Sequence, residues 1–268
     1  MRLRLPISMA RPRSIAPPRA EYWRAQWERQ QTLHVPDRAQ RFDAMLDWLV
    51  AAEGRSPRCL DLGCGTGAIT ERIVRRFPRA HVVAIDWDPV TRRLGEVGLR
   101  KYRGRIRWVD ADLRSRDWTD RIPTGRFDAA LSSTALHWLR EPELARLYRD
   151  LYRLLRPGGI VLNADRLSYD RSARRLRAVE RALPDRTVRR GPGRPPKVRT
   201  WDEWWTAIAR ERPLRKEVAL HQVRFPTAHT DQPTPDLPGH VRLLRAAGFS
   251  EVEIVYARGA SRILAALR

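Results

Sequence analysis

The stretch CLDLGCGTG, residues 59–67, places three glycines within five positions, directly after an apolar run that ends in an acid. The apolar run is typical of a buried strand, and AITERIVRRF at 68–77 is predicted to form a helix. A glycine loop between a strand and a helix directs backbone N–H groups at whatever binds there. The spacing of Gly63, Gly65 and Ala68 also satisfies a degenerate dinucleotide fingerprint. The loop alone therefore leaves two ligand classes open, a pyrophosphate-bearing dinucleotide and a ligand without phosphate.

Strands and helices are predicted to alternate on both sides of this loop. This alternation predicts right-handed crossovers and a Rossmann-like α/β fold, a doubly wound, mostly parallel sheet of seven strands. The predicted helices of the core are 21–31, 38–54, 68–77, 90–102, 143–155 and 240–249, and the predicted strands are 58–62, 81–86, 105–111, 127–133, 160–165, 250–258 and 261–268.

The regular alternation stops after Asp165 and resumes near residue 238. We therefore predict an insertion, a helical cap after strand five that folds over the sheet. The chain divides into a disordered basic leader at 1–19, with Met9 as a second candidate start, N-terminal helices and a ligand-binding core at 20–165, the inserted helical cap at 166–237, and a C-terminal helix with the last two strands at 238–268.

Composition limits the class of protein. A chain of 268 residues that is 42% hydrophobic can bury a sizeable core. No apolar run approaches the length of a membrane span and the Arg-rich start lacks the apolar centre of a signal peptide, so we expect a cytoplasmic protein without membrane contact. The two cysteines, Cys59 and Cys64, are too few for a disulfide framework or a four-ligand zinc site, and we expect both to be small buried residues. No metal site is predicted.

The formal charge of +22 would attract anions such as nucleic acid, acidic lipid or acidic metabolites. The cations are 50 arginines and only 3 lysines. A binding surface would not obviously exclude lysine, which also serves against phosphate. We therefore favour a G- and C-rich genome over an anionic partner as the main cause of the charge.

The acid before the glycine loop separates the two ligand classes. Asp61 lies two residues before Gly63, where its carboxylate would repel a pyrophosphate. A ligand that carries a sulfonium and an α-amino group is compatible with this carboxylate.

Five motifs then follow one another in a recognisable order: LDLGCGTG, VVAIDWDP, WVDADL, FDAALSSTALHWL and LLRPGGIVL. Together they span about residues 57–163, and the chain resembles the class I S-adenosylmethionine-dependent methyltransferases. Within that superfamily, FDAALSSTALHW is similar to the trans-aconitate methyltransferase-like group of small-molecule enzymes. The resemblance implies S-adenosylmethionine as cofactor and methyl transfer to a small-molecule acceptor, at a carboxylate or hydroxyl oxygen.

The resemblance also implies roles for the residues around the loop. Gly63, Gly65 and Gly67 would form the turn beneath the methionine part of the cofactor. Asp61 would order the loop and receive the amino group, and Asp86 would accept both ribose hydroxyls.

The resemblance also implies which residues, near the end of the predicted strand at 105–111, would bind the adenine. Asp112, with Leu113 beside it, would meet the adenine amino group and ring, and Asp110 is the alternative in a shifted register. Trp87 would pack on the adenine face, unless it is an amphipathic surface indole. Ser132 is also assigned to the cofactor site, with helix capping as its alternative role.

His137 is the candidate catalytic residue. It lies in TALHWL, the short helix that faces the methyl donor in this family, where it would act as a general base or bind the acceptor. The alternative is a structural histidine packed against Trp138.

The inserted cap is expected to select the acceptor. It carries 11 arginines between residues 166 and 199, typical either of an entrance for an anionic acceptor or of a solvated helix and loop. Trp201, Trp204 and Trp205 would pack the cap on the core or form a wall for an aromatic acceptor.

The basic tract at 186–199 raises a nucleic-acid alternative, an RNA or DNA methyltransferase or a nucleic-acid-associated cofactor-binding protein. The motif SSTA, residues 132–135, differs from the Asn/Asp-Pro-Pro-aromatic sequence of amino-base methylators, which argues against it. The oligomeric state is not indicated.

Overall fold

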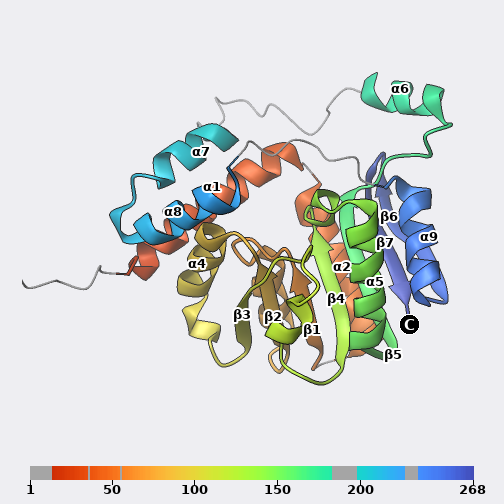
Figure 1. Cartoon of the computed structure of the whole chain (residues 1–268), viewed down its shortest axis with the longest axis horizontal. Helices are drawn as coiled ribbons and strands as arrows, with labels where there is room; N and C mark the ends of the chain where they lie inside the picture. The colour runs from red at the N-terminus through yellow and green to blue at the C-terminus, as the bar shows by residue number, and fades with distance from the viewer. Residues whose placement is uncertain (1–13, 36, 55, 183–197, 227–234) are drawn as a thin grey trace, which may run out of the picture.

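A seven-stranded sheet forms the centre of the molecule, in the order β3-β2-β1-β4-β5-β7-β6 (Figure 1). The computed structural model describes residues 14–35, 37–54, 56–182, 198–226 and 235–268. Strand β7 runs antiparallel to both neighbours and the other pairs are parallel, which confirms the predicted doubly wound fold. The strands are β1 (Arg58–Leu62), β2 (His81–Asp86), β3 (Ile106–Asp110), β4 (Phe127–Ser133), β5 (Leu155–Arg166), β6 (Glu251–Arg258) and β7 (Ser261–Leu267).

Helices cover both faces of this sheet. The α-helices are α1 (Pro17–His34), α2 (Arg38–Glu53), α3 (Ala68–Arg76), α4 (Pro89–Gly98), α5 (Glu141–Leu154), α6 (Arg174–Ala182), α7 (Trp201–Ile208), α8 (Arg215–Arg224) and α9 (Leu237–Ala247). Short 3₁₀ helices are η1 (Arg100–Tyr102), η2 (Trp118–Arg121), η3 (Leu136–Trp138) and η4 (Arg212–Leu214).

Strand β1 shows why the sheet is buried on both sides. Cys59 packs with α2 and α3 on one face, whereas Leu60 and Leu62 pack with α5 and α9 on the other. All three are fully buried, as expected for a parallel strand covered by two helical layers. Cys59 and Cys64 are buried and unpaired, which confirms their predicted role as small core residues.

The start of α1 corrects the predicted end of the leader at residue 19. Helix α1 begins at Pro17, a residue type whose fixed φ suits the first turn of a helix. Ile15 is only 3% exposed and joins the apolar cluster formed by α1, α4 and α7. The prolines that indicated a loop therefore mark a helix start, while residues 1–13, including Met9, lie outside the described residues.

Strand β5 begins earlier than predicted, directly where α5 ends. Leu155 pairs with Phe127, and the register then shifts so that Ile160 pairs with Ala129. The irregular stretch contains Pro157, which has no N–H for a regular ladder. Residues 156–159, between the predicted helix at 143–155 and the predicted strand at 160–165, thus form an irregularity inside the strand.

The segment inserted after β5 carries α6, η4, α7 and α8. Helix α7 packs on α1 and α8 packs on α4, while α6 stands apart from them (Figure 1). Within the predicted cap, residues 183–197, which include most of the basic tract at 186–199, and residues 227–234 lie outside the described residues.

Five indoles join α7 to α1. The tryptophan cluster consists of Trp23, Trp27, Trp201, Trp204 and Trp205. Trp204 is fully buried, with its ring centroid 4.8 Å from that of Trp27. For Trp204 this confirms the interpretation that the tryptophans pack the insertion on the core.

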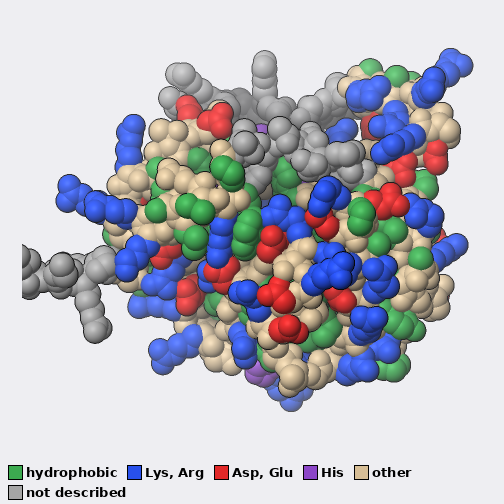
Figure 2. Space-filling model, viewed as in Figure 1, with side chains coloured by type: hydrophobic (Ala, Val, Ile, Leu, Met, Phe, Trp, Pro, Cys, Tyr) green, Lys and Arg blue, Asp and Glu red, His purple; other side chains and the backbone are tan. Residues whose placement is uncertain are grey.

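Charge is spread over the surface. On the face shown in Figure 2, Lys and Arg side chains are distributed over the whole molecule and are interspersed with Asp and Glu. None of the helices in the described residues has both the length and the apolar character needed to cross a membrane.

Candidate active site

The glycine loop joins β1 to α3, and its glycines adopt backbone conformations that other residues avoid. Gly63, Gly65 and Gly67 have φ values of +66°, +53° and +81°. A Cβ at Gly63 would collide with the side chain of Ala135 after β4, whereas a Cβ at Gly65 would point into open space. A Cβ at Gly67 would collide with the Trp108 ring. The loop is therefore packed at Gly63 and Gly67 and bare at Gly65, where a ligand could approach the backbone.

Asp61 holds the loop from beneath. Its Oδ2 accepts hydrogen bonds from the backbone N–H of Thr70 at 3.0 Å and from the Thr70 hydroxyl at 2.5 Å. The side chain is only 1% exposed, and burial raises the pKa of Asp61 to about 6, although both hydrogen bonds oppose this rise. Asp61 thus ties the end of β1 to the first turn of α3.

Asp86 holds the loop from the side. At the end of β2, its Oδ2 accepts the Gly65 N–H at 2.6 Å and its Oδ1 accepts the Asp88 N–H at 2.7 Å. The Asp86 side chain is half-buried, and its desolvation, followed by the nearby charge of Asp88, raises the pKa of Asp86 to about 7. Asp86 therefore lies beside the open part of the loop.

Asp110, the last residue of β3, and Asp112, two residues later, have different partners. Asp112 forms a bidentate pair with Arg114, with both closest distances at 2.9 Å. Asp110 pairs with Arg92 at 3.0 Å and with Arg224 at 2.7 Å. The predicted site residue Leu113 is buried beside Asp112 in the core between the sheet, α5 and α9.

Helix α8 reaches this end of the sheet, which the sequence did not indicate. Arg224 donates to the carbonyl of Trp87 at 2.5 Å and to Asp110, and His221 Nδ1 lies 2.6 Å from Asp88 Oδ2. The Trp87 ring meets Phe225 edge to face, with centroids 5.1 Å apart. A basic residue in a helix of the insertion has no sequence pattern that links it to β2 or β3, so these contacts depend on the fold.

His137 lies in η3, after β4, and pairs with a second residue that sequence reasoning missed. His137 Nδ1 is 2.9 Å from Asp165 Oδ1, at the end of β5. Burial alone would raise the pKa of Asp165, but the charge and hydrogen bond of His137 outweigh it and lower the pKa. The ionised carboxylate can only accept, so the imidazole donates through Nδ1. Asp165 could have been found as an acid that ends a parallel strand, as Asp86 does.

A buried cation lies on the same edge. Arg41 of α2 is 1% exposed, and its Nη2 is 3.4 Å from the hydroxyl of Ser133. Burial lowers the pKa of Arg41, and the nearby carboxylates of Asp37 and Asp165 oppose this effect. The predicted site residue Ser132 points inward instead, and its hydroxyl donates to the carbonyl of Leu62 at 2.9 Å.

These residues form two groups. Asp61, the glycine loop and Asp86 occupy the ends of β1 and β2, hereafter the loop side. Ser133, His137 and Asp165 lie at or just after the ends of β4 and β5, and Arg41 of α2 contacts Ser133; these four residues are hereafter the histidine side. The parallel pairing of β1 with β4 places the carboxyl ends of both strand pairs on one edge of the sheet, where open α/β sheets bind ligands.

Comparison with known proteins identifies relatives. Residues 59–159 match a family model described as a methyltransferase domain. A trans-aconitate 2-methyltransferase of Azoarcus sp. strain BH72 is 32% identical over 151 residues, which cover 56% of this chain and 54% of that protein. A malonyl-(acyl-carrier protein) O-methyltransferase of Geobacter sulfurreducens is 29% identical over 214 residues, 80% of this chain and 74% of that protein. The chain thus spans about half the length of the first relative.

Among solved structures, a protein described as a DhpI–SAM–HEP complex superposes with a TM-score of 0.53 and 18% identity. The match covers 96% of this chain and 99% of that chain. At this identity, the similarity concerns the fold alone.

Proposed function

We propose that this chain, whose residues 59–159 match a methyltransferase domain, acts as a class I S-adenosylmethionine-dependent methyltransferase and transfers a methyl group to an oxygen of a small-molecule acceptor. The observation that carries the proposal is the clamped glycine loop, in which the Asp86 carboxylate holds Gly65 while the face of Gly65 stays open. A bare backbone beside an acceptor-only carboxylate suits a ligand with hydroxyl and amino donors.

The loop side fits S-adenosylmethionine in its donor and acceptor groups. Asp86 would accept the ribose hydroxyls, and the backbone N–H groups of the glycine loop would face the methionine carboxylate. Asp112 and Trp87 would contact the adenine. Arg224 of α8 would hold Trp87 and Asp110 in place. Asp61 and Ser132 act indirectly in this proposal, because their hydrogen bonds are made inside the protein.

When bound, S-adenosylmethionine supplies an electrophilic methyl group. The protein then has to position the acceptor oxygen in line with that methyl, exclude water, and remove a proton where the acceptor is a hydroxyl. Asp165 fixes the Nδ1 proton of His137, so Nε2 is the nitrogen that would take the acceptor's proton. The His137 side chain is 31% exposed, so part of the ring is accessible.

Methylation at oxygen is supported by the relatives named as trans-aconitate and malonyl-(acyl-carrier protein) methyltransferases, whose names point to carboxylic acids as acceptors. A carboxylate acceptor would need no base, and His137 would then bind it. The nucleic-acid alternative is not favoured, since the matched relatives are not named as nucleic-acid enzymes. We also propose a cytoplasmic location, in keeping with two unpaired cysteines.

The test combines binding and transfer. Calorimetric titration with S-adenosylhomocysteine should give one site of micromolar affinity, and methyl-labelled S-adenosylmethionine should label members of a panel of di- and tricarboxylic acids and hydroxylated acids. Absence of cofactor binding would contradict the methyltransferase proposal. Cofactor binding together with labelling of duplex DNA or RNA alone would contradict the small-molecule acceptor.

A further inference from the structure

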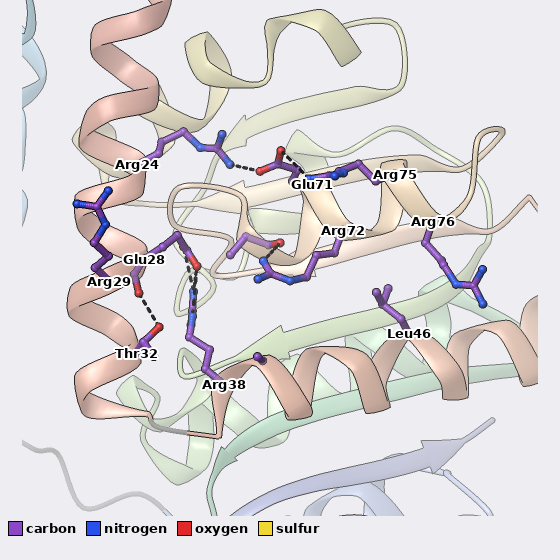
Figure 3. A pocket seen from close by; sticks show the side chains of 12 residues that line it. Arg24, Glu28, Arg29, Thr32, Arg38, Leu46, Glu71, Arg72, Arg75 and Arg76 are labelled. Carbon is purple, nitrogen blue, oxygen red and sulfur yellow. Dashed lines mark hydrogen bonds and ion pairs between the residues drawn. The ribbon is translucent and has the colours of Figure 1, made fainter. Parts of the chain in front are cut away.

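A cavity lies in the angle between α1, α2 and α3 (Figure 3). Its lining reaches Ala68, directly after the glycine loop, and contains neither Asp86 nor His137. Its volume is about 610 Å³, within the usual range of small-molecule sites. Six arginines line it: Arg24, Arg29, Arg38, Arg72, Arg75 and Arg76. The lining also contains Glu28 and Glu71, so four positive charges remain after both acids are counted.

The two acids are already engaged by arginines. Glu28 pairs with Arg38 at 3.1 Å, and Glu71 pairs with Arg24 at 2.8 Å (Figure 3). Arg24 and Arg38 are buried, and Arg24 Nε also donates to the carbonyl of Thr66 in the glycine loop at 2.9 Å. Glu71 also lies 3.9 Å from Arg75, at the limit of an ion pair. The two acids are thus shared among Arg24, Arg38 and Arg75, and the excess of four positive charges remains.

Arg72 is the central cation of the cavity. It lies between the two ion pairs in Figure 3, and its Nη1 donates to the carbonyl of Ala68, one turn earlier, at 2.9 Å. Its guanidinium also lies 4.4 Å from the centre of the Phe42 ring. Among the described residues, Arg72 forms no ion pair: Glu28 pairs with Arg38, and Glu71 pairs with Arg24 and Arg75. Burial lowers the pKa of Arg72, and the nearby charge of Glu28 opposes this effect. The contacts that orient the Arg72 guanidinium, with the Ala68 carbonyl and the Phe42 ring, therefore leave it without a paired anion.

The arginine-rich composition alone would not make this a site, because arginines are spread over the whole surface. The cavity differs in that its excess charge is gathered around a hollow and its central guanidinium is held in one orientation. Like charges gathered in this way repel one another, and an anion in the hollow would relieve that repulsion.

We propose that this cavity binds a small molecule carrying two or more phosphate groups, of which inorganic pyrophosphate is the simplest example. Arginine forks bind phosphate oxygens in pairs, and each phosphate carries about −1.5 to −2 charges at neutral pH. Two phosphate groups therefore match the four excess positive charges. The site does not depend on methyl transfer, so its test needs neither cofactor nor acceptor.

The experiment is calorimetric titration of the full chain with sodium pyrophosphate at physiological ionic strength. One saturable site is expected, and Arg72→Gln should weaken it by about tenfold or more. Arg72→Lys should weaken it less, because the charge remains while the fork is lost. Arg76→Gln, an exposed position on the same helix, should weaken it by about threefold without affecting the fold.

The matched control is Arg149→Gln, which removes one charge from an exposed position on α5, outside the cavity. It should change the affinity by less than about twofold. Absence of saturable binding by the unmodified protein would overturn the proposal. Equal losses in the Arg72, Arg76 and Arg149 variants would also overturn it, because binding would then follow net charge and not the cavity.

Discussion

The loop side and the histidine side are held together by different kinds of bond. On the loop side, carboxylates grip backbone N–H groups: Asp61 holds Thr70 and Asp86 holds Gly65, over 9 and 21 residues of sequence. On the histidine side, bonds between side chains predominate: His137 meets Asp165 over 28 residues and Arg41 meets Ser133 over 92, although Asp165 also accepts the backbone N–H of His137 at 3.3 Å. Backbone-held groups are fixed by the strand and loop themselves, whereas side-chain pairs can be exchanged while the fold is kept. We infer from this difference that the loop side, which would bind the cofactor, tolerates fewer substitutions than the histidine side, which would bind the acceptor.

The largest effect should come from a break in the loop side. Gly63→Val would place a side chain against Ala135 at a φ of +66°, so we expect a loss of about 2–4 kcal/mol in unfolding free energy and of cofactor binding. Urea denaturation measures the first and calorimetry the second. Gly104→Ala is the control, because nothing lies within 4 Å of its Cβ position. Equal effects at the two glycines would contradict the inference that the packing of Gly63 in the loop is needed for folding and cofactor binding.

The next effect tests whether the histidine side acts in chemistry. His137→Ala should lower turnover by about 100-fold, and Asp165→Asn by about tenfold, with cofactor affinity within about twofold of the unmodified protein. Rates would be measured with the acceptor found by methyl labelling. For Asp165→Asn, the pH–rate profile should also shift, because the partner that stabilises the imidazolium is lost. If both variants weaken cofactor binding and leave turnover intact, the histidine side contributes to cofactor binding and not to the chemical step.

A smaller effect is expected from pH on the loop side. The pKa of Asp86 is raised to about 7, so the carboxylate is mostly protonated at pH 6 and mostly ionised at pH 8. Ribose hydroxyls donate to the ionised form, so cofactor affinity should fall by about tenfold from pH 8 to pH 6. Calorimetry of the unmodified protein and Asp86→Asn would check this. The variant should bind weakly at both values, and an unchanged pH dependence would assign the titration to another group.

The same carboxylate has the opposite effect on folding. Because its pKa is raised in the folded chain, the folded state takes up a proton between about pH 4 and pH 7 that the unfolded state does not. This stabilisation is fully present at the acid end of that range and is lost as the pH rises to 7. Stability and cofactor affinity should therefore change in opposite directions.

The smallest effect concerns the link between the insertion and the loop side. Arg224→Gln removes the bonds from α8 to Asp110 and to the Trp87 carbonyl, and should weaken cofactor binding by about threefold. Arg215→Gln, exposed at the start of α8, is the matched control. Calorimetric titration with S-adenosylhomocysteine would compare the two variants. Equal affinities would mean that the contacts of Arg224 do not support cofactor binding.

The same contrast explains what the sequence could predict. The doubly wound sheet follows from strands and helices whose apolar residues repeat over short distances, and the three glycines of the loop are adjacent in the chain. The pair of His137 with Asp165 and the contacts of Arg224 join segments whose distance in space depends on strand order and on the docking of α8. Local patterns can mark Asp165 as an acid near the end of a strand, but they carry no information on its pairing with His137 or on the docking of α8. Pro17 misled for a related reason, because proline favours both loops and first turns of helices.

The tryptophan cluster has an optical consequence. Its indoles come from α1 and α7, with ring centroids of Trp27 and Trp204 4.8 Å apart and those of Trp204 and Trp205 5.0 Å apart. At such separations the electronic transition dipoles of neighbouring indoles couple, which produces an exciton band in circular dichroism. That band depends on α7 resting against α1 and not on the sheet. Its loss on heating, compared with the backbone spectrum, would show whether the insertion detaches before the core melts.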